Sequence, residues 1–528
     1  MNAIPVTADP TTAPTADALA VIPLLNCLLR ELADPVADRP AHLLLDQASP
    51  GPRTYRLRAG GDLLRVRGRH RPHDPELWSD QGWRRLHHAD LVDLVTREMA
   101  LATGLSNDAL ADEMAESHEA VAAILAARAR TEAPADAWLR SEQALVTGHP
   151  FHPAPKARGG GPADGWLRYA PEAHARFPLV LLGVREDALV EEGDTRALDA
   201  LGRAPAGYRV LPAHPWQLAL TAHLPELRAA FDDGRLVRLG ETPWPVHPTA
   251  SVRTVHLPGR RPAGHDEDLF LKFSLDVRIT NDVRRLWRHD LLRLLRTDRA
   301  VAAAFATGAE RPGAAWMSDR GYRTVDGLFE ACAVLVRDGL DRHLRPGTTA
   351  LLPAALAEGF EGNPLDRLAD PRPWWAAYLR CVVPPVLDAF ARHGLVLECH
   401  LQNTLVAVDA AGTPVQAVFR DPEGVKHVPE VGRGAGWERL VYCLVVNHLA
   451  ELAGALAERF PGAAPALWTA VRREFEAYAD RRALPEIADL LAGPTLPGKA
   501  NLLLRWTDAD GAASRYLPLP NPLLESRA

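Results

Sequence analysis

The sequence LKFSLDVRITNDVRR, residues 271–285, changes its hydrophobic period partway along. Apolar and polar side chains alternate up to Thr280, which is typical of a half-buried β-strand. Apolar positions then recur at helical spacing, so we expect a helix that is capped by Thr280 or Asn281. Arg284 and Arg285 would lie in the first helical turn, where the helix dipole disfavours cations. An anion bound at the helix start would explain them; solvated arginines on an amphipathic strand–helix unit are the alternative.

A second alternating segment, residues 248–257, precedes this stretch. If the two segments pair as an antiparallel hairpin, opposite residue numbers sum to about 526, which brings Arg253 close to Lys272. One sheet face would then present a polyanion-binding set: Ser251, Arg253, Lys272 and Arg284. In a straight strand, however, Lys272 and Thr280 are about 26 Å apart. Either the strand bends there, or the two residues serve opposite ends of an extended ligand.

The composition is that of an ordinary globular protein, with 47% hydrophobic and 24% charged residues. The length of 528 residues predicts roughly three domains. A net charge of -7 argues against nucleic-acid binding. The five cysteines are scattered and lack CxxC spacing, which favours a reduced, cytoplasmic protein without a cysteine-based zinc site. Because the N-terminus has no basic region followed by a long apolar run, we expect neither a signal peptide nor a transmembrane helix.

The first part of the chain, from Asp17 to about Leu145, is predicted to be mainly helical. The clearest helices are expected over residues 90–101 and 111–130. A hairpin is expected around the Ala-Gly-Gly-Asp sequence that follows Arg58.

Residues 148–161, GHPFHPAPKARGGG, form a predicted loop whose prolines restrict the backbone. The loop gathers His149, His152, Lys156 and Arg158. The two cations beside a glycine run could cradle a phosphate, and an ordinary surface loop is the alternative. The histidine spacing could suit zinc, but the sequence offers no third ligand nearby.

The last part of the chain, from about Asp326, is again predicted to be mainly helical, with a long apolar helix over residues 374–392 and a short strand over 500–508. Between them, residues 395–406 alternate and would place Glu398, His400 and Gln402 on one strand face. Pairing with a strand over residues 415–419 gives sums of about 823, which brings the following Asp421 close to this face.

This polar strand face is a candidate site for two reasons. Buried polar side chains need partners, so a strand rarely uses three successive same-face positions for Glu, His and Gln. Glu398 and Asp421 are also a candidate magnesium pair, because Mg²⁺ usually takes one or two carboxylates together with phosphate oxygens.

Six short blocks in this order resemble one enzyme family. They are HPFHPAPK at 149–156, HPWQ at 214–217, SVR at 251–253, KFSLDVRITN at 272–281, ECHLQN at 398–403 and RD at 420–421. Together they resemble the NRPS-independent siderophore synthetases of the aerobactin-synthetase (IucA/IucC) type over about residues 148–510. Cys399, and the Pro-Glu-Gly that follows Asp421, depart from the family pattern and bear on the shape of the substrate pocket.

The resemblance implies an α+β fold shaped like a cupped hand. A helical thumb would span residues 1–147, and a β-rich fingers domain with the ATP-binding strands and the HPxHPxxK loop would span 148–325. A mostly helical palm would span 326–528 and carry a catalytic hairpin at 395–421. A homodimer is expected by analogy.

The resemblance also implies a cytoplasmic, ATP- and Mg²⁺-dependent ligase of siderophore biosynthesis, which serves iron acquisition. Such enzymes adenylate a carboxylate of citrate or a related acid. An amine, hydroxylamine or alcohol then displaces AMP and leaves an amide or ester. The implied partners are these small molecules, without nucleic acid or membrane.

Residue by residue, the resemblance implies three groups. The catalytic group is Thr280, Arg284 and His400. The ATP-binding group is His152, Lys156, Arg158, Ser251, Arg253, Lys272, Asn281, Gln402 and Asn403. The metal-binding pair is Glu398 and Asp421.

Two rival interpretations remain open. The ECHLQN sequence followed by a hairpin and an aspartate loosely resembles the catalytic loop of small-molecule kinases, which release ADP. No aspartate occupies the catalytic-base position and no glycine-rich loop precedes Lys272, which argues against a phosphotransferase. The second rival is a ligand-binding protein without catalysis.

Overall fold

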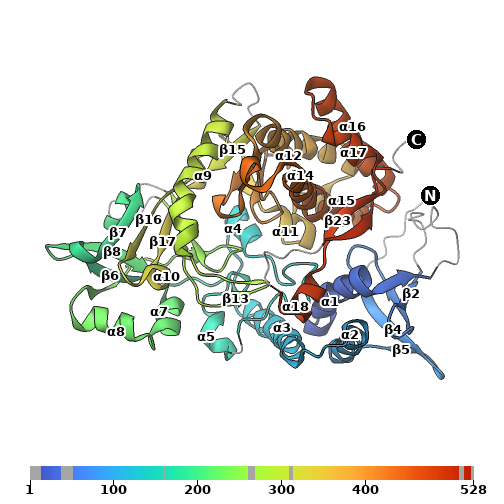
Figure 1. Cartoon of the computed structure of the whole chain (residues 1–528), viewed down its shortest axis with the longest axis horizontal. Coiled ribbons are helices and arrows are strands. Elements are labelled where there is room, and N and C mark those ends of the chain that lie inside the picture. Colours follow the sequence, from blue (N-terminus) through green and yellow to red (C-terminus); the bar gives the residue numbers. More distant parts are fainter. Residues whose placement is uncertain are drawn as a thin grey trace.

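The computed structural model describes residues 14–36, 51–159, 161–259, 268–307, 313–509 and 516–524. Helices and sheets are mixed within these residues, which confirms the predicted α+β class. Figure 1 shows the N-terminal elements in blue, the middle of the chain in green and yellow, and the C-terminal elements in orange and red, packed side by side. The domain boundaries after residues 147 and 325 stay a prediction.

The described N-terminal part combines four helices with a sheet. Its elements are α1 (Ala16–Leu32), β1 (Ala33–Pro35), β2 (Arg53–Leu57), β3 (Leu63–Arg67), β4 (His73–Ser79), β5 (Gly82–Arg85), α2 (His88–Thr103), α3 (Asp108–Arg128) and α4 (Ala137–Glu142). The β2–β3 hairpin and helices α2 and α3 confirm the sequence prediction. The segment is mainly helical as predicted, and the five-stranded sheet β1–β5, which extends the predicted hairpin, was not expected. Its strands are short and bury few side chains, so they leave little periodic signal in the sequence.

The middle of the chain is built on two sheets. Its elements are α5 (Ala163–Leu167), η2 (Pro171–Ala173), β6 (Val180–Arg185), η3 (Glu186–Ala188), β7 (Leu189–Gly193), α6 (Arg196–Asp199), β8 (Tyr208–Ala213), α7 (Pro215–Thr221), α8 (Pro225–Asp232), β9 (Leu236–Glu241), β10 (His247–Pro248), β11 (Thr254–Leu257), β12 (Leu269–Phe273), β13 (Arg278–Ile279), β14 (Asp282–Val283), α9 (Arg288–Thr307), β15 (Ala314–Met317), β16 (Asp319–Val325), α10 (Phe329–Cys332) and β17 (Val334–Asp338). One sheet has the order β8-β6-β9 and the other β10-β11-β12-β17-β16-β7.

The predicted hairpin register is confirmed, because Thr254 lies opposite Lys272 and the numbers sum to 526. The two strands are shorter than expected. A turn that holds Ser251 and Arg253 separates β10 from β11, and β12 ends at Phe273. All five residues of β12 are buried, because the strand lies inside the sheet between β11 and β17.

The predicted helix start at Thr280 or Asn281 is wrong, since α9 begins at Arg288. The chain instead doubles back through a small hairpin, in which the Arg284 N–H donates to the Val277 carbonyl at 3.0 Å. Thr280 sits at the turn with a φ of 60°, a left-handed conformation that a helix cannot include. Arg284 therefore lies before the helix, so the helix-dipole argument does not apply to it. The strand bends, which resolves the long separation between Lys272 and Thr280.

The C-terminal part is mostly helical. Its elements are η4 (Leu340–Arg342), β18 (Thr349–Leu351), α11 (Pro353–Glu358), η5 (Pro364–Arg367), α12 (Pro371–His393), β19 (Leu395–Val396), β20 (Thr404–Val408), β21 (Pro414–Arg420), η6 (Pro422–Gly424), β22 (Lys426–His427), α13 (Val428–Val431), α14 (Arg433–Val441), the π-helix η7 (Tyr442–Leu449), α15 (Ala450–Arg459), α16 (Ala464–Arg481), α17 (Glu486–Ala492), β23 (Thr495–Lys499), α18 (Asn501–Trp506) and β24 (Tyr516–Pro520). The long helix predicted over residues 374–392 is confirmed as α12, and Gly394 has the left-handed conformation that ends helices.

Two strand predictions here need correction. The hairpin β20–β21 has the predicted sum of 823, with Thr404 opposite Phe419. However, the segment before it is not a strand, because residues 397–403 form an irregular loop between β19 and β20. We call residues 397–403 the active-site loop below. The predicted strand over residues 500–508 is also wrong, since helix α18 occupies most of it.

Two cores bear on the site. The largest surrounds α12, which buries Trp375, Tyr378 and Phe390 against the C-terminal helices. The N-terminal core includes Leu502 and Trp506, so α18 packs beside α1 although the two are far apart in sequence (Figure 1). The segment Arg433–Arg459 is long and apolar enough to cross a membrane, but 78% of its apolar window is buried inside the protein, as in a core helix.

Candidate active site

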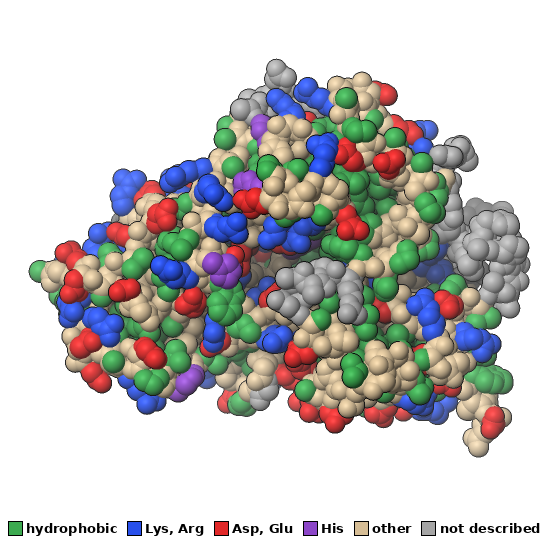
Figure 2. All heavy atoms as spheres, in the orientation of Figure 1, with side chains coloured by type: hydrophobic (Ala, Val, Ile, Leu, Met, Phe, Trp, Pro, Cys, Tyr) green, Lys and Arg blue, Asp and Glu red, His purple; other side chains and the backbone are tan. Residues whose placement is uncertain are grey.

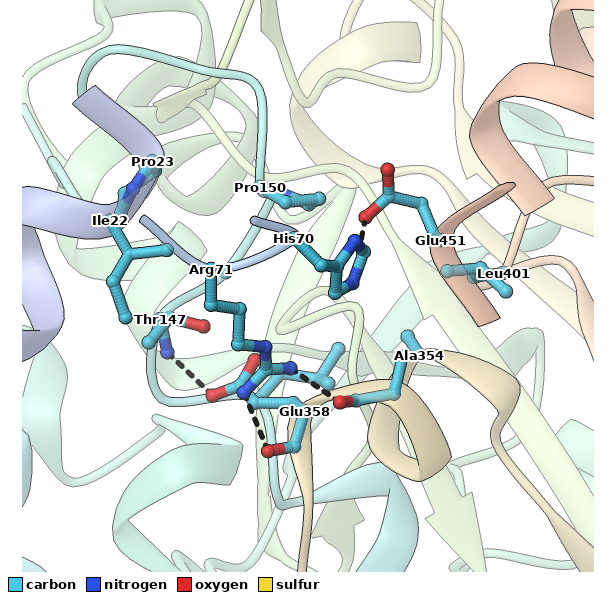
Figure 3. Close-up of a pocket in the computed structure, with 13 residues that line it drawn as sticks. Ile22, Pro23, His70, Arg71, Thr147, Pro150, Ala354, Glu358, Leu401 and Glu451 are labelled. Carbon is cyan, nitrogen blue, oxygen red and sulfur yellow. Dashed lines mark hydrogen bonds and ion pairs between the residues drawn. The ribbon is translucent and has the colours of Figure 1, made fainter. Parts of the chain in front are cut away.

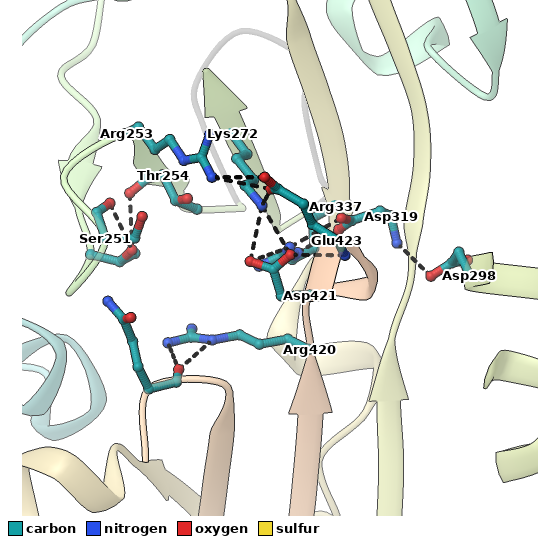
Figure 4. A network of polar contacts seen from close by, with 12 residues as sticks. Ser251, Arg253, Thr254, Lys272, Asp298, Asp319, Arg337, Arg420, Asp421 and Glu423 are labelled. Atoms are coloured by element: carbon teal, nitrogen blue, oxygen red, sulfur yellow. Dashed lines mark hydrogen bonds and ion pairs between the residues drawn. The ribbon is translucent and has the colours of Figure 1, made fainter. Parts of the chain in front are cut away.

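A buried lysine and two carboxylates form the centre of the candidate site (Figure 4). Lys272 on β12 is 1% exposed, and its Nζ donates to Asp421 Oδ1 at 2.9 Å and to Glu423 Oε2 at 2.5 Å. Asp421 follows β21, and Glu423 lies in the adjoining η6. The β12 strand and the β20–β21 hairpin therefore meet at this cluster.

Two arginines complete the cluster. Arg253 Nη2 donates to Glu423 Oε2 at 3.1 Å, and its Nη1 donates to the Arg284 carbonyl at 3.0 Å. Arg337 on β17 lies 3.6 Å from Asp421 Oδ2 and is held from behind by Asp319. These cations hold the pKa of Asp421 well below its usual range and lower the pKa of Glu423 to about 2, so both carboxylates are charged at neutral pH.

Asp421 adopts an unusual backbone conformation, with a φ of 78° and a ψ of 90°. A residue with a side chain rarely tolerates this region, so the surrounding contacts must hold it there. Its side chain also accepts from the Glu423 N–H at 3.3 Å, which fixes the turn between the two carboxylates. Strained residues of this kind cluster at functional sites.

The active-site loop lies beside this cluster. Its Glu398 accepts from Arg439 Nη2 at 2.6 Å. Its Gln402 donates through Nε2 to the Ala250 carbonyl at 3.1 Å, while Arg420 Nη2 donates to the Gln402 carbonyl at 2.8 Å. The loop is thus anchored to both the middle and the C-terminal part of the chain.

His400 lies at the centre of the active-site loop, and burial lowers its pKa, so the ring is neutral near pH 7. Its Nδ1 accepts from the Gln402 N–H at 3.3 Å, which leaves the ring proton on Nε2 as a donor. The charges of Glu398 and Asp421 raise the pKa of this ring, and the charge of Arg284 lowers it.

Thr280 and Arg284 are brought together by the bend after β12. Arg284 Nη2 donates to Thr280 Oγ1 and to the Ile279 carbonyl, both at 2.8 Å. Burial and the neighbouring Arg253 lower the pKa of the Arg284 guanidinium. The carboxylates of Asp282, Glu423 and Glu398 act on this pKa in the opposite direction.

The two cations of the predicted phosphate-binding loop, residues 148–161, pair with a carboxylate outside the Lys272 cluster. Lys156 and Arg158 are buried and both pair with the carboxylate of Glu172, and Lys156 also donates to the Leu145 carbonyl. A nucleotide contact would require these cations to leave Glu172, so their ATP-binding role stays a prediction.

The histidines of the same loop lie closer to the site. The pKa of His149 is lowered to about 3 by burial and by its neighbours His400 and Lys499. His152 lies beside Asn281, whose side chain also donates to Asn501 at 3.2 Å.

The remaining predicted residues, Ser251 and Asn403, contribute backbone carbonyls to the described hydrogen bonds around the cluster. Ser251 is half-buried in the turn before β11, and its carbonyl accepts from the Thr254 N–H at 2.7 Å. Asn403 follows Gln402, and its carbonyl accepts from the Arg420 N–H at 3.0 Å. The structure therefore brings together the residues of four predicted blocks, at 251–253, 272–281, 398–403 and 420–421.

The sequence analysis missed two residues here. Glu423 stood out only as part of a departure from the family pattern, yet it binds both Lys272 and Arg253. Lys499, at the end of β23, was not singled out from the sequence. Burial lowers the pKa of Lys499. The charge of Arg439 lowers it further, and the charges of Asp282 and Glu398 raise it. Among the described residues its ammonium has no hydrogen bond or ion pair, so it is available to an anionic ligand. Lys499 is recognised as a site residue only in the folded chain, where the segments that carry Asp282, Glu398 and Arg439 come together around it.

The residues present fit a magnesium ion. The donor set offers Asp421 and Glu423 at one turn, and a Cβ on Gly424 would lie only 1.8 Å from Glu398 Oε2, which places that carboxylate over the same turn. Within the described ranges no three His, Cys, Asp or Glu side chains form a ready metal site. Mg²⁺ needs fewer protein ligands, because it binds through one or two carboxylates with water and phosphate oxygens.

Basic side chains also gather on the surface nearby. Figure 2 shows Lys and Arg side chains concentrated near the middle of the face, beside a recess between the groups of elements. A positive surface at the entrance of a site attracts anionic substrates.

A separate pocket of about 490 Å³, partly open to solvent, touches the active-site loop only through Leu401 (Figure 3). Its polar groups contact one another. His70 lies 3.6 Å from Glu451, and Arg71 donates to the carbonyls of Ala357 and Glu358 at 2.6 and 2.7 Å. These contacts join the N-terminal part to the C-terminal helices, so we assign the pocket a structural role.

Comparison with known proteins gives a consistent result. The IucA / IucC family model matches residues 137–358, and a model described as ferric iron reductase FhuF-like transporter matches residues 372–514. The L-2,3-diaminopropanoate–citrate ligase of Staphylococcus aureus is 28% identical over 74% of this chain and 75% of its own. The rhizobactin siderophore biosynthesis protein RhbC of Rhizobium meliloti is 28% identical over 97% of this chain and 98% of its own.

Solved structures show that the fold is shared. ATP-bound aerobactin synthetase IucA from a hypervirulent Klebsiella pneumoniae pathotype superposes with a TM-score of 0.80 at 22% identity, covering 96% of this chain and 99% of that one. The matched family model spans α4 to α11, including β12 and Lys272, and the curated relatives extend over most of the chain. Residues 137–358 therefore match the IucA/IucC family, and most of the chain is similar to siderophore biosynthesis proteins and citrate ligases.

Proposed function

We propose that the protein is an ATP-dependent siderophore synthetase, which adenylates a carboxylate of citrate or a citrate derivative and condenses it with an amine, hydroxylamine or alcohol. The observation that carries this proposal is the buried Lys272 cluster next to Arg284 and His400. It combines cations for a polyphosphate, carboxylates for a metal and separate donors for an activated acid.

The phosphates of ATP would bind to Lys272 and Arg253. Both side chains now neutralise Asp421 and Glu423, so phosphate oxygens would replace these carboxylates as partners. The released carboxylates would then be free to hold magnesium. Mg²⁺, when bound, would supply positive charge that neutralises the departing pyrophosphate.

The acid would be activated at Arg284, Thr280 and His400. A substrate carboxylate oxygen forms a bond to the α-phosphorus of ATP, and the bond from that phosphorus to pyrophosphate breaks. Negative charge builds up in this transition state, and fixed donors aimed at it are the largest source of rate enhancement. The Nε2–H of His400 and the guanidinium of Arg284 are suitable donors.

Lys499 would hold a further carboxylate of the acid, because its unpaired ammonium lies near His149 and Glu398. A tricarboxylic acid has such a group to offer after one carboxylate has been activated. In the second half-reaction the nucleophile attacks the acyl carbon, AMP leaves with the bonding electrons, and the nucleophile loses a proton.

A phosphotransferase is the rival function. The active-site loop contains Glu398 and His400 but no aspartate that could act as a catalytic base. The absence of that base argues for adenylation within this loop, and the nucleotide product separates the two functions.

We also infer a cytoplasmic location and a homodimer, which rest on the family alone. Light scattering of the purified protein would test the dimer.

The test is hydroxylamine trapping with a panel of acids: citrate, 2-oxoglutarate, succinate and malate. Acyl-hydroxamate, AMP and pyrophosphate are measured together, with Arg284→Ala as the inactive control. Acid-dependent AMP with citrate supports the proposal, whereas ADP as the product would support the kinase. AMP with none of these acids, while ATP still binds, would exclude free citrate and leave pre-condensed citryl derivatives to be tested.

A further inference from the structure

The active-site loop is supported by a π-helix, an element that is rare in proteins and frequent near functional sites. The π-helix η7 continues α14 and leads into α15. Its wider turn places His448, which is 0% exposed, beneath the loop. There His448 Nδ1 lies 2.6 Å from the carbonyl oxygen of Cys399.

The hydrogen-bond partners of His448 determine where its ring proton lies. A carbonyl oxygen can only accept, so Nδ1 must carry the proton and donate to Cys399. Nε2 must then accept from the hydroxyl of Tyr378, which is its other partner. Burial lowers the pKa of His448 to about 4, so the ring stays neutral in this tautomer near pH 7.

Tyr378 is itself held firmly. It is fully buried on α12 and stacks on Trp374 and Trp375, with ring centroids 5.3 and 5.6 Å apart. The tautomer of His448 is therefore set by the rigid core around α12. Two consecutive hydrogen bonds, from Tyr378 to His448 and from His448 to Cys399, connect this core to the active-site loop.

The acceptor at the end of this chain is well placed to affect catalysis. The Cys399 carbonyl belongs to the peptide group whose nitrogen is that of His400, and Glu398 lies one residue earlier. The same oxygen also accepts from Thr404 Oγ1 at 3.2 Å. Two donors thus fix one peptide plane between Glu398 and His400. A rotation of that plane would change the backbone torsions of Cys399 and His400, and with them the direction of the His400 ring and the path of the loop next to Glu398.

We propose that His448 is a positioning residue, which orients Glu398 and His400 through its Nδ1–H bond to the Cys399 carbonyl. This proposal rests on the proposed function, since it assigns the two side chains a part in adenylation. His448 itself touches no substrate.

Two isosteric variants separate positioning from simple stability. The amide nitrogen of Asn reaches the place of Nδ1, so His448→Asn keeps the donor to Cys399 and loses the bond to Tyr378. The amide of Gln reaches the place of Nε2, so His448→Gln keeps the acceptor for Tyr378 and loses the donor to Cys399. Each variant removes one buried hydrogen bond, so both should lower the thermal unfolding midpoint by similar amounts.

The kinetic outcomes are expected to differ. His448→Gln should lower kcat for acid-dependent AMP release by about ten-fold or more, with KM for ATP nearly unchanged, because a small misplacement of reacting groups is costly. His448→Asn should stay within about three-fold of the parent. Equal kcat values for the two variants would overturn the proposal.

Crystal structures of both variants test the same claim without activity. The peptide between Cys399 and His400 should rotate in His448→Gln and stay in place in His448→Asn. An unmoved peptide in His448→Gln would also refute the positioning role. If the parent protein releases no AMP with any acid, the proposed function fails, and the structures still decide whether His448 fixes the loop.

Discussion

Replacing Lys272 by Met should destabilise the protein, because it leaves two carboxylates without their shared cation. Lys272 is 1% exposed, and the side chains of Asp421 and Glu423 are only 21% and 24% exposed. Removing one partner of a buried ion pair typically costs about 3–5 kcal/mol. Because Arg253 and Arg337 still contact the two carboxylates, we expect the lower end, about 3 kcal/mol at pH 7.

The pH dependence of this loss follows from the pKa values. The pKa of Glu423 is lowered to about 2 from an ordinary 4.5, and that of Asp421 is also lowered. A carboxyl group whose pKa is lower in the folded than in the unfolded protein stabilises the fold at pH values above its ordinary pKa. This stabilisation is lost as the pH falls through the pKa of the folded state. The stability gap between the parent and Lys272→Met should therefore be full at pH 7 and narrow below about pH 4.5.

Scanning calorimetry measures this gap as a shift in unfolding midpoint. About 3 kcal/mol corresponds to about 6–12 °C for a cooperative unit of 150–250 residues. Adding Glu423→Gln to Lys272→Met removes one uncompensated charge and should recover part of the loss, which makes it the matched control. A shift below about 2 °C at pH 7, or a gap that does not narrow in acid, would refute the reasoning.

Three further predictions concern the reaction. Arg284→Ala and His400→Ala should each lower kcat/KM by about 10²–10³-fold while keeping the parent's unfolding midpoint; wild-type rates in both would remove them from the site. Asp421→Asn should raise the Mg²⁺ concentration needed for half-maximal AMP release by about ten-fold or more, and Glu398→Gln should do the same less strongly; an unchanged Mg²⁺ titration in both would exclude them as ligands. Lys499→Met should raise KM for a tricarboxylic acid by about ten-fold and leave KM for ATP unchanged, since a hydrogen-bonded charge contributes about 1.5–3 kcal/mol; equal effects on both constants would argue for a structural role.

The sequence predicted pairings better than it predicted where strands end. The register sums for β11–β12 and β20–β21 are both confirmed, because alternation and turn signals constrain a hairpin locally. The same alternation wrongly predicted a helix start at Thr280. There the chain reverses at one residue in the left-handed conformation, which the hydrophobic period does not indicate.

Residues of the site were predictable where a hairpin register brought the polar side chains of two segments together. Lys272 is the clear case, since the predicted pairing placed it close to Arg253. Glu423 and Lys499 were not predictable in this way. Glu423 lies in the short η6 and Lys499 ends the strand β23, and their roles depend on segments that meet only in the folded chain.

The packing of α18 against α1 has a consequence for protein synthesis. Glu31 at the end of α1 is buried, and its carboxylate accepts from the N–H groups of Leu502 and Leu503 at 2.9 and 2.8 Å. At translation rates of about 5–20 residues per second, roughly half a minute to a minute and a half separates α1 from these partners. During that interval the emerging N-terminal core is incomplete and its apolar face is open to chaperones. Helix α1 is thus synthesised long before α18, whose N–H groups satisfy its buried carboxylate.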